Sequence, residues 1–280
     1  MSTTPDELRS QVRETYATVA TTSGACGPGC CSVGAEGSLA MGYTAEDLAA
    51  VPEGANMGLG CGNPQAIAAL RPGERVLDLG SGGGFDAFLA ARQVGEEGHV
   101  IGVDMTPAMV AKARANAKTL GLAHVEFRLG EIEHLPVEDG TIDVILSNCV
   151  INLSPDKPRV VREAFRVLAP GGRLAISDVV AIGELPETLR TTAAHVTCVA
   201  GATPIGELRA MLEAAGFQDV QVNVRPESAA FIAQWLPGSG AEAHVASASI
   251  EAVRPGTPRT AKARVRLGVA PPCDPDSGCC

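Results

Sequence analysis

The amino-acid sequence predicts an α/β fold with a largely parallel β-sheet. Short apolar segments alternate with helix-like segments between residues 75 and 178, which is the pattern of successive βαβ units. A glycine-rich loop follows the first apolar segment directly. The chain has 280 residues, of which 45% are hydrophobic, so it can build the core of one large α/β domain with a small appendage.

Helices and loops, rather than sheet, are expected over residues 1–64. Apolar residues at spacings of three or four predict a helix over residues 5–20. Thr44, with Asp47 three residues later, forms an imperfect capping box that predicts a short helix. That helix covers residues 44–50, and the loops before and after it cover residues 22–38 and 52–64.

The regular part of the chain is expected to begin at Arg75. Thr106 and Pro107 are suitable as the N-cap and first residue of a helix that Gly121 ends. Pro170-Gly171-Gly172 is expected to stop a later helix. The expected strands cover residues 75–79, 99–103, 124–128, 142–147 and 173–178, and the expected helices cover residues 84–94, 107–120 and 156–168.

The pattern loosens after the fifth strand. From Arg254 onward the composition shifts to Pro, Arg, Lys and Gly, which indicates an irregular tail. Further helices are expected over residues 187–199, 204–215 and 226–236, and further strands over residues 218–224 and 244–253. These changes divide the chain into the segments 1–64, 65–180, 181–253 and 254–280.

Charge and composition exclude several classes of function. The formal charge is −10, no run of Lys or Arg exceeds two residues, and aromatic residues make up 3%, so no nucleic-acid partner is expected. The N-terminus lacks the features of a signal peptide, and no apolar stretch approaches the roughly 18 residues that span a bilayer. We therefore expect a cytoplasmic monomer without a membrane partner. Its nine cysteines are then expected to serve as thiols rather than as a disulfide framework.

A cofactor site is expected at the glycine-rich loop, which reads VLDLGSGGG over residues 76–84. Glycine permits a tight turn and a close approach of a ligand to the backbone. Asp78 precedes the loop, and Asp104 lies 20 residues after Gly84, where a carboxylate can bind ribose hydroxyls. Glu131, after the third strand, is expected near an adenine. A dinucleotide loop has the spacing G-x-G-x-x-G, whereas G-x-G-x-G after an acid favours a cationic cofactor without phosphate.

This loop resembles the first motif of class I S-adenosylmethionine methyltransferases. The resemblance implies a Rossmann-like, seven-stranded mixed sheet. It also implies that residues 65–180 bind S-adenosylmethionine and that residues 181–253 form a C-terminal substrate-binding region. The cofactor-binding residues that it implies are Asp78, Gly80, Ser81, Gly82, Gly84, Asp104, Met105, Glu131, Ile132 and Asn148.

Three cysteines are candidates for chemistry, and two of them have glycine or polar neighbours, unlike the apolar run expected around a purely structural thiol. Cys61 lies in GLGCGNP, on a glycine-rich loop expected to be mobile, and Cys198 lies in HVTCVAGA. Cys149 lies in SNCVINL, just past the fourth strand, where an open α/β sheet places its ligands. Thiolates are soft ligands, so these residues favour a soft metal or a metalloid.

At these stretches, and at GVDMT and AISDV, the chain resembles arsenite S-adenosylmethionine methyltransferases over about residues 12–255. The resemblance implies that three cysteines bind arsenite and methylated trivalent arsenic: Cys61, Cys149 and Cys198. It also implies a fourth, N-terminal cysteine that pairs reversibly with the first of these. The candidates for that cysteine are Cys26, Cys30 and Cys31, of which we favour Cys31.

The implied reaction is methyl transfer to the lone pair of an arsenic atom held by three thiolates. Arsenic carries no proton to remove, so the transfer needs no general base. A thiol reductant, glutathione or thioredoxin, is the expected source of electrons. The final methylation state, the acceptance of antimony and the roles of three tail cysteines stay open: Cys273, Cys279 and Cys280.

Two other functions fit parts of the sequence. A methyltransferase for a small organic molecule would use the glycine-rich loop but would not need Cys149. A thiol-based protein that sequesters metalloids would use the cysteines but would not need a nucleotide site. The N-terminal cysteines could also form a zinc knuckle with the tail, although the chain has no C-x-x-C pair.

Overall fold

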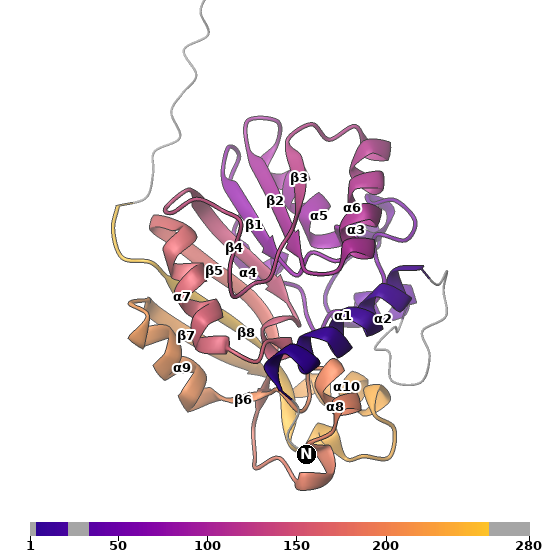
Figure 1. Cartoon of the computed structure of the whole chain (residues 1–280). Coiled ribbons are helices and arrows are strands. Elements are labelled where there is room, and N and C mark those ends of the chain that lie inside the picture. Colours follow the sequence, from indigo (N-terminus) through magenta and orange to yellow (C-terminus); the bar gives the residue numbers. More distant parts are fainter. Residues whose placement is uncertain (1–3, 22–33, 258–280) are drawn as a thin grey trace, which may run out of the picture.

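The computed structural model describes residues 4–21 and 34–257 of the chain (Figure 1). Its centre is one mixed sheet with the strand order β3-β2-β1-β4-β5-β8-β7, and the two-residue strand β6 (Thr203–Pro204) pairs with β5. The other strands are β1 (Arg75–Leu79), β2 (His99–Asp104), β3 (Val125–Leu129), β4 (Ile142–Asn148), β5 (Leu168–Ala181), β7 (Gln218–Arg225) and β8 (Val245–Val253). The expected seven-stranded mixed sheet is confirmed, with one short strand added.

Strands β1 to β5 pair in parallel, and β8 and β7 extend the sheet antiparallel beyond β5. The central strands β1 and β4 are buried over most of their length. Strands covered on both faces need apolar residues at almost every position, which explains the continuous apolar runs in the sequence. Edge strand β7 is exposed at half of its positions instead, because only one of its faces meets the core.

Helices cover both faces of the sheet, in two apolar layers. One layer contains α7 (Lys157–Val167) and α9 (Ile205–Ala214), packed on alternate residues of the central strands, such as Leu77 and Ile145. The other contains α4 (Gln65–Ala68), α5 (Phe85–Val94) and α6 (Pro107–Leu120). These helices pack on the strand residues that point to the other face of the sheet. This alternation is the period of two that a strand imposes on its side chains.

A third apolar cluster lies at the carboxyl end of the sheet and holds the three cysteines of interest: Cys61, Cys149 and Cys198. Helix α1 (Pro5–Thr21) crosses in front of this end and contacts α6 and α8 (Thr192–Val196) (Figure 1). Helix α10 (Ala229–Trp235) packs into the same cluster. The short helices α2 (Gly34–Ala40) and α3 (Ala45–Ala49) connect α1 to the sheet.

Four local expectations were wrong. Residues 34–40 form a helix where a loop was expected. The helix expected over residues 187–199 is broken into the 3₁₀ turn Glu187–Leu189 and α8, and the one expected over 226–236 begins as the 3₁₀ turn Pro226–Ser228. Strand β5 begins at Leu168, before the Pro-Gly-Gly sequence. The backbone of Gly171 and Gly172 forms hydrogen bonds with Arg254, the residue that follows β8, so this segment extends the strand.

The capping predictions had two outcomes. The capping box of α3 is complete rather than imperfect: Thr44 N–H donates to Asp47 Oδ2 (2.8 Å) and Asp47 N–H donates to Thr44 Oγ1 (3.1 Å). Thr106 does precede α6, and Pro107 is its first residue, but the threonine side chain makes no capping hydrogen bond. Its backbone N–H is held by Asp104 instead (2.8 Å).

None of the helices within the described ranges is long and apolar enough to cross a membrane. Several predictions fall outside those ranges. They concern the candidate redox cysteine Cys31 and its neighbours Cys26 and Cys30, and most of the irregular tail, including its cysteines.

Candidate functional site

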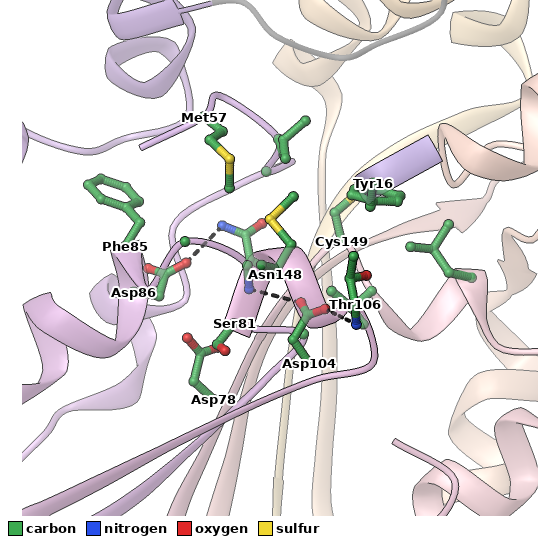
Figure 2. Close-up of a pocket in the computed structure, with 18 of the residues that line it drawn as sticks. Tyr16, Met57, Asp78, Ser81, Phe85, Asp86, Asp104, Thr106, Asn148 and Cys149 are labelled. Atoms are coloured by element: carbon green, nitrogen blue, oxygen red, sulfur yellow. Dashed lines mark hydrogen bonds between the residues drawn. The ribbon is translucent and has the colours of Figure 1, made fainter. Parts of the chain in front are cut away.

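A cavity of about 1100 Å³, counted with its opening to solvent, lies at the carboxyl ends of β1, β2 and β4. The glycine-rich loop forms its floor, residues 55–60 form one wall, and α1 contributes Val12 and Tyr16. Figure 2 shows Asp78, Asp104 and Cys149 around this space. Parallel α/β sheets bind ligands at this edge, so the cavity is where the sequence predicts it.

The glycine-rich loop is held in place by the end of β2. Gly80 N–H and Ser81 N–H both donate to Val103 O, at 2.8 and 3.0 Å. Gly82 N–H donates to Asp104 Oδ2 (3.0 Å) (Figure 2). Gly80 and Gly82 have φ of 66° and 50°, a left-handed conformation that favours glycine. The loop is thereby fixed with its backbone beside the cavity.

Four acidic residues line the cavity: Asp78, Asp86, Asp104 and Glu133. Burial raises the pKa of Asp78 well above its ordinary value, with Asp86 and Asp104 adding to the effect. Burial also raises the pKa of both of those neighbours. Asp78 Oδ2 and Ser81 Oγ are buried and have no hydrogen-bond partner within the described residues. A cation that also donates hydrogen bonds would satisfy these groups, so the cavity fits the cationic cofactor expected from the sequence.

A polar network that was not predicted joins the cavity to the Cys61 loop. Tyr43 Oη donates to Asp86 Oδ1 (2.7 Å), and Asn148 Nδ2 donates to Tyr43 Oη (2.9 Å) and to Gly62 O (2.9 Å). Asn148 Oδ1 accepts from Cys61 N–H (3.0 Å). Asn148 was predicted to bind the cofactor. It lines the cavity, and its hydrogen bonds also hold the Cys61 loop in place.

The Cys61 loop is consequently not the mobile segment that its glycines suggested. Cys61 is fully buried, and Ser247 Oγ donates to its carbonyl oxygen (2.6 Å). A Cβ at Gly60 or Gly62 would crowd the side chain of Asn148 or Ser177, respectively. These glycines are needed for close packing rather than for flexibility.

The three predicted cysteines meet behind the cavity wall. Cys149 contacts the thiols of both Cys61 and Cys198, and Cys198 Sγ donates to Cys149 O (2.9 Å). Only Cys149 lines the cavity, and the other two lie deeper. Cys149 and Cys198 have φ of 59° and 64°, an unusual conformation for residues with a Cβ. Such strain is concentrated at functional sites.

The surroundings of Cys149 and Cys198 favour the protonated form of both thiols. A hydrogen bond from Cys198 lowers the pKa of the Cys149 thiol, but contact with Cys61 and burial outweigh it and raise that pKa well above its ordinary value. A hydrogen bond to Cys149, together with burial, raises the pKa of Cys198 in the same way. Neutral thiols can pack together in an apolar cluster without the cost of burying several anions.

The buried carboxyl group of Asp178 lies beside the thiols and was not predicted. One of its oxygens and the sulfur atoms of Cys61 and Cys149 all lie within 4.8 Å of one another. Burial raises the pKa of Asp178 to about 6, opposed by hydrogen bonds from backbone N–H groups and by Lys157. The only sequence signal for this residue is its place in the AISDV motif.

Most of the predicted cofactor residues line the cavity: Asp78, Gly80, Ser81, Gly82, Asp104, Met105, Ile132 and Asn148. Gly84 and Glu131 do not. Gly84 begins α5 beneath the loop and packs against Phe88 and Phe127. Glu131 pairs with Arg9 (3.8 Å) and Arg13 (3.3 Å) of α1, so it holds α1 over the sheet edge.

Sequence reasoning also missed part of the cavity wall. Thr106, which ends GVDMT, was predicted only as a helix cap, and the other missed residues lie in none of the motifs above: Tyr43, Met57, Phe85, Asp86 and Glu133.

Comparisons with known proteins show the family to which the chain belongs. Residues 70–216 match the family described as "Methyltransferase domain". The chain is 51% identical over 264 residues to an arsenite methyltransferase of Halobacterium salinarum, covering 90% of this chain and 68% of that one. It is 46% identical over 168 residues to an arsenite methyltransferase of Aquipseudomonas alcaligenes, covering 57% and 48%. The chain thus spans about two thirds of the first relative and about half of the second.

A solved structure supports the same comparison. The crystal structure of an arsenic(III) S-adenosylmethionine methyltransferase from Chlamydomonas reinhardtii matches with a TM-score of 0.58 at 36% sequence identity. The match covers 78% of this chain and 72% of that chain.

The two glycines Gly82 and Gly84 are expected to respond differently to alanine. A Cβ at Gly84 would lie 2.6 Å from Phe88, so Gly84→Ala should lower the free energy of unfolding by about 2–4 kcal/mol through strain and overpacking. The nearest atom to a Cβ at Gly82 is Met57 Cε at 3.4 Å, so Gly82→Ala should cost only about 1 kcal/mol. Urea unfolding measures both. Equal losses would show that backbone strain, and not crowding by aromatic rings, decides the effect.

The buried carboxyl groups also predict how stability depends on pH without a ligand. Burial raises the pKa values of Asp78, Asp86 and Asp104, so the folded protein binds these protons more tightly than the unfolded chain. Stability contributed by these groups is therefore present at acidic pH and is lost as pH rises through their folded pKa values. The free energy of unfolding should therefore fall as pH rises above about 4, the ordinary pKa of an aspartate. Asp78→Asn should flatten this slope and stabilise the protein at the higher pH; an unchanged slope in that variant would exclude Asp78 as a cause.

Proposed function

Because the chain belongs to the arsenite methyltransferase family, we propose that it methylates trivalent arsenic, both arsenite and methylarsenite, with S-adenosylmethionine as the methyl donor. One observation carries this proposal: three buried thiols meet directly behind an acidic, ligand-sized cavity, and one of them, Cys149, lines that cavity. Soft sulfur ligands favour a thiophilic metalloid. The acidic cavity favours a cationic donor.

S-adenosylmethionine supplies an electrophilic methyl group when it is bound. In the proposed complex Asp104 binds the ribose, Asp78 and Ser81 complete their hydrogen bonds on polar donor groups of the cofactor, and Met105 and Ile132 contact the adenine. The structural support is that all of these residues line one cavity. The protein's contribution is then mainly proximity and alignment of the two reactants.

The thiol cluster is proposed to hold arsenic with its lone pair directed at the cavity. Each neutral thiol displaces one hydroxide or one small thiol from arsenic, and the thiol proton leaves with that group. Cys149 is suited to make the first exchange because it alone of the three lines the cavity. Cys61 and Cys198 can then complete the set, since both already contact the Cys149 thiol.

Reduction of arsenic after each transfer is proposed to draw two electrons from thiols, which form a disulfide. Glutathione or thioredoxin is the proposed final donor, and a disulfide between Cys31 and Cys61 is the proposed intermediate carrier. A cytoplasmic location suits this chemistry because that compartment keeps thiols reduced. We expect the enzyme to act as a monomer, because the proposed ligands and cofactor residues all come from one chain.

The proposed activity is tested by incubating the protein with S-adenosylmethionine, arsenite and glutathione. We expect S-adenosylhomocysteine and methylated arsenic to appear together, measured by chromatography coupled to elemental mass spectrometry. Cys149→Ser is the control, and it should form neither product. Arsenic binding without S-adenosylhomocysteine would indicate sequestration instead. Full activity of the control variant on a small organic acceptor would indicate the other methyltransferase function.

The cysteines are expected to differ between successive methylations. Arsenite can bind three thiols, whereas methylarsenite has only two exchangeable positions. Cys149 and Cys198 are linked directly through Cys198 Sγ and Cys149 O, so we expect them to serve as the pair for methylarsenite. Cys61→Ser should therefore abolish methylation of arsenite and spare that of methylarsenite, whereas Cys149→Ser and Cys198→Ser should abolish both. Loss of both reactions in Cys61→Ser would show that Cys61 is needed beyond the first methyl group.

A further inference from the structure

Asp178 is a fixed carboxyl group beside the thiol cluster, and the proposed function gives it no role. It is almost completely buried, and one of its oxygens lies within 4.8 Å of both the Cys61 and the Cys149 sulfur atoms. It does not line the cavity. An arsenic atom bound to those two sulfur atoms would therefore have a carboxyl group as a close neighbour.

The hydrogen bonds of Asp178 suit a negatively charged carboxylate. Its Oδ1 accepts from Val179 N–H (2.7 Å) and from Asn152 Nδ2 (2.8 Å), and its Oδ2 accepts from Ile151 N–H (3.0 Å). Each of these three groups is a donor, and none of them neutralises the charge. The nearby ammonium of Lys157 donates to Gly201 O and to Thr203 Oγ1 (2.9 Å) rather than to the carboxylate. The negative charge of Asp178 therefore remains available to act on the thiol cluster.

The proposed methyl transfer moves a positive charge toward this carboxylate. The arsenic lone pair forms the arsenic–carbon bond, and the carbon–sulfur bond of the sulfonium breaks with its electron pair left on sulfur. The sulfonium becomes a neutral thioether, and the neutral three-coordinate arsenic becomes a four-coordinate cation. One unit of positive charge thus leaves the acidic cavity and enters the buried thiol cluster. In a site of low dielectric constant, fixed charges next to a developing charge act strongly.

We propose, on the basis of the proposed function, that Asp178 accelerates the methyl transfer by stabilising the positive charge that arsenic acquires. The acidic residues of the cavity stabilise the cation before the transfer, and Asp178 stabilises it afterward. Without a carboxylate beside the thiols, the charge would move from an anionic surrounding into an apolar one. Such a transfer is costly unless a counter-charge is present.

The test is a single-turnover measurement with arsenite already bound, at about pH 8, following S-adenosylhomocysteine formation from labelled S-adenosylmethionine. Asp178→Asn should slow the methyl-transfer step by about 10- to 100-fold, with the affinities for arsenite and for S-adenosylmethionine changed by less than about threefold. Arsenite affinity can be followed by equilibrium dialysis or by fluorescence of Trp235, the single tryptophan, which packs in the same cluster as the cysteines.

Asn152→Ala is the matched control, because it removes one hydrogen bond to Asp178 and one to Val179 O, and it leaves the carboxylate in place. Its methyl-transfer rate should stay within about threefold of the wild-type rate. Equal slowing in both variants would show that the hydrogen-bonded turn, and not the charge, matters, and would overturn the proposal. A wild-type rate in Asp178→Asn would overturn it as well.

A second variant keeps the proposal testable if Asp178→Asn no longer folds or binds arsenite. Lys157→Gln removes a cation near Asp178 and Cys198 while keeping a side chain that can donate hydrogen bonds. If the charge on arsenic governs the step, this variant should transfer methyl groups at least as fast as the wild type, whereas slower transfer would overturn the proposal. If the wild-type protein itself forms no S-adenosylhomocysteine with arsenite, the proposed function fails, and Asp178 is not the cause.

Discussion

The parallel pairing of β4 with β1 on one side and β5 on the other is the constraint on which the whole site depends. Leu79 pairs with Ser147, and Asn148 pairs with Ser177, so all three strands reach the same edge of the sheet. The glycine-rich loop, the Cys149 turn and the AISDV segment are therefore brought together although they are far apart in the chain. Side chains alternate between the two faces of a strand, so a slip of one residue in β4 would turn Asn148 away from the Cys61 loop.

The buried polar groups at this edge fall into two kinds. Asp178 is satisfied by donors from its own surroundings, so it is part of the finished fold. Asp78 Oδ2 and Ser81 Oγ lack a partner among the described residues, although burying a polar group without a hydrogen bond costs free energy. Both residues line the cavity, where a ligand can complete their hydrogen bonds, whereas Asp178 does not line it. The unpaired atoms of Asp78 and Ser81 lower the stability of the free protein at the site where the cofactor is proposed to bind.

The thiol cluster combines a strained backbone with a rigid frame. Two of its three cysteines adopt a left-handed backbone conformation, and the third is held by Asn148 and Ser247. Preorganised ligands lose little entropy when a substrate binds. Because Asn148 also lines the cavity, the geometry of the cofactor site and that of the thiol cluster depend on one side chain. The two halves of the proposed reaction are thus aligned by the fold before either reactant arrives.

The sequence by itself determined the order of strands and helices, the place of the cofactor loop and the three cysteines that meet. Each of these follows from local signals: apolar runs, glycine and proline residues that end helices and strands, and short motifs around single residues. Local signals were weakest where tertiary contacts override them, as at β5, whose Pro-Gly-Gly segment becomes part of a strand through Arg254. They also gave no sign that Glu131 pairs with arginines of helix α1.

Only the tertiary structure decided how these parts are joined. Tyr43, Asp86 and Asn148 belong to no common motif, yet their side chains form one network. The loop of Cys61 is glycine-rich, which predicted mobility, but its glycines allow other segments to pack tightly against it. The charge of Asp178 acts on thiols that come from three separate segments. Such features depend on distances between residues that are remote in sequence, and burial changes their hydrogen bonds and pKa values only after the chain has folded.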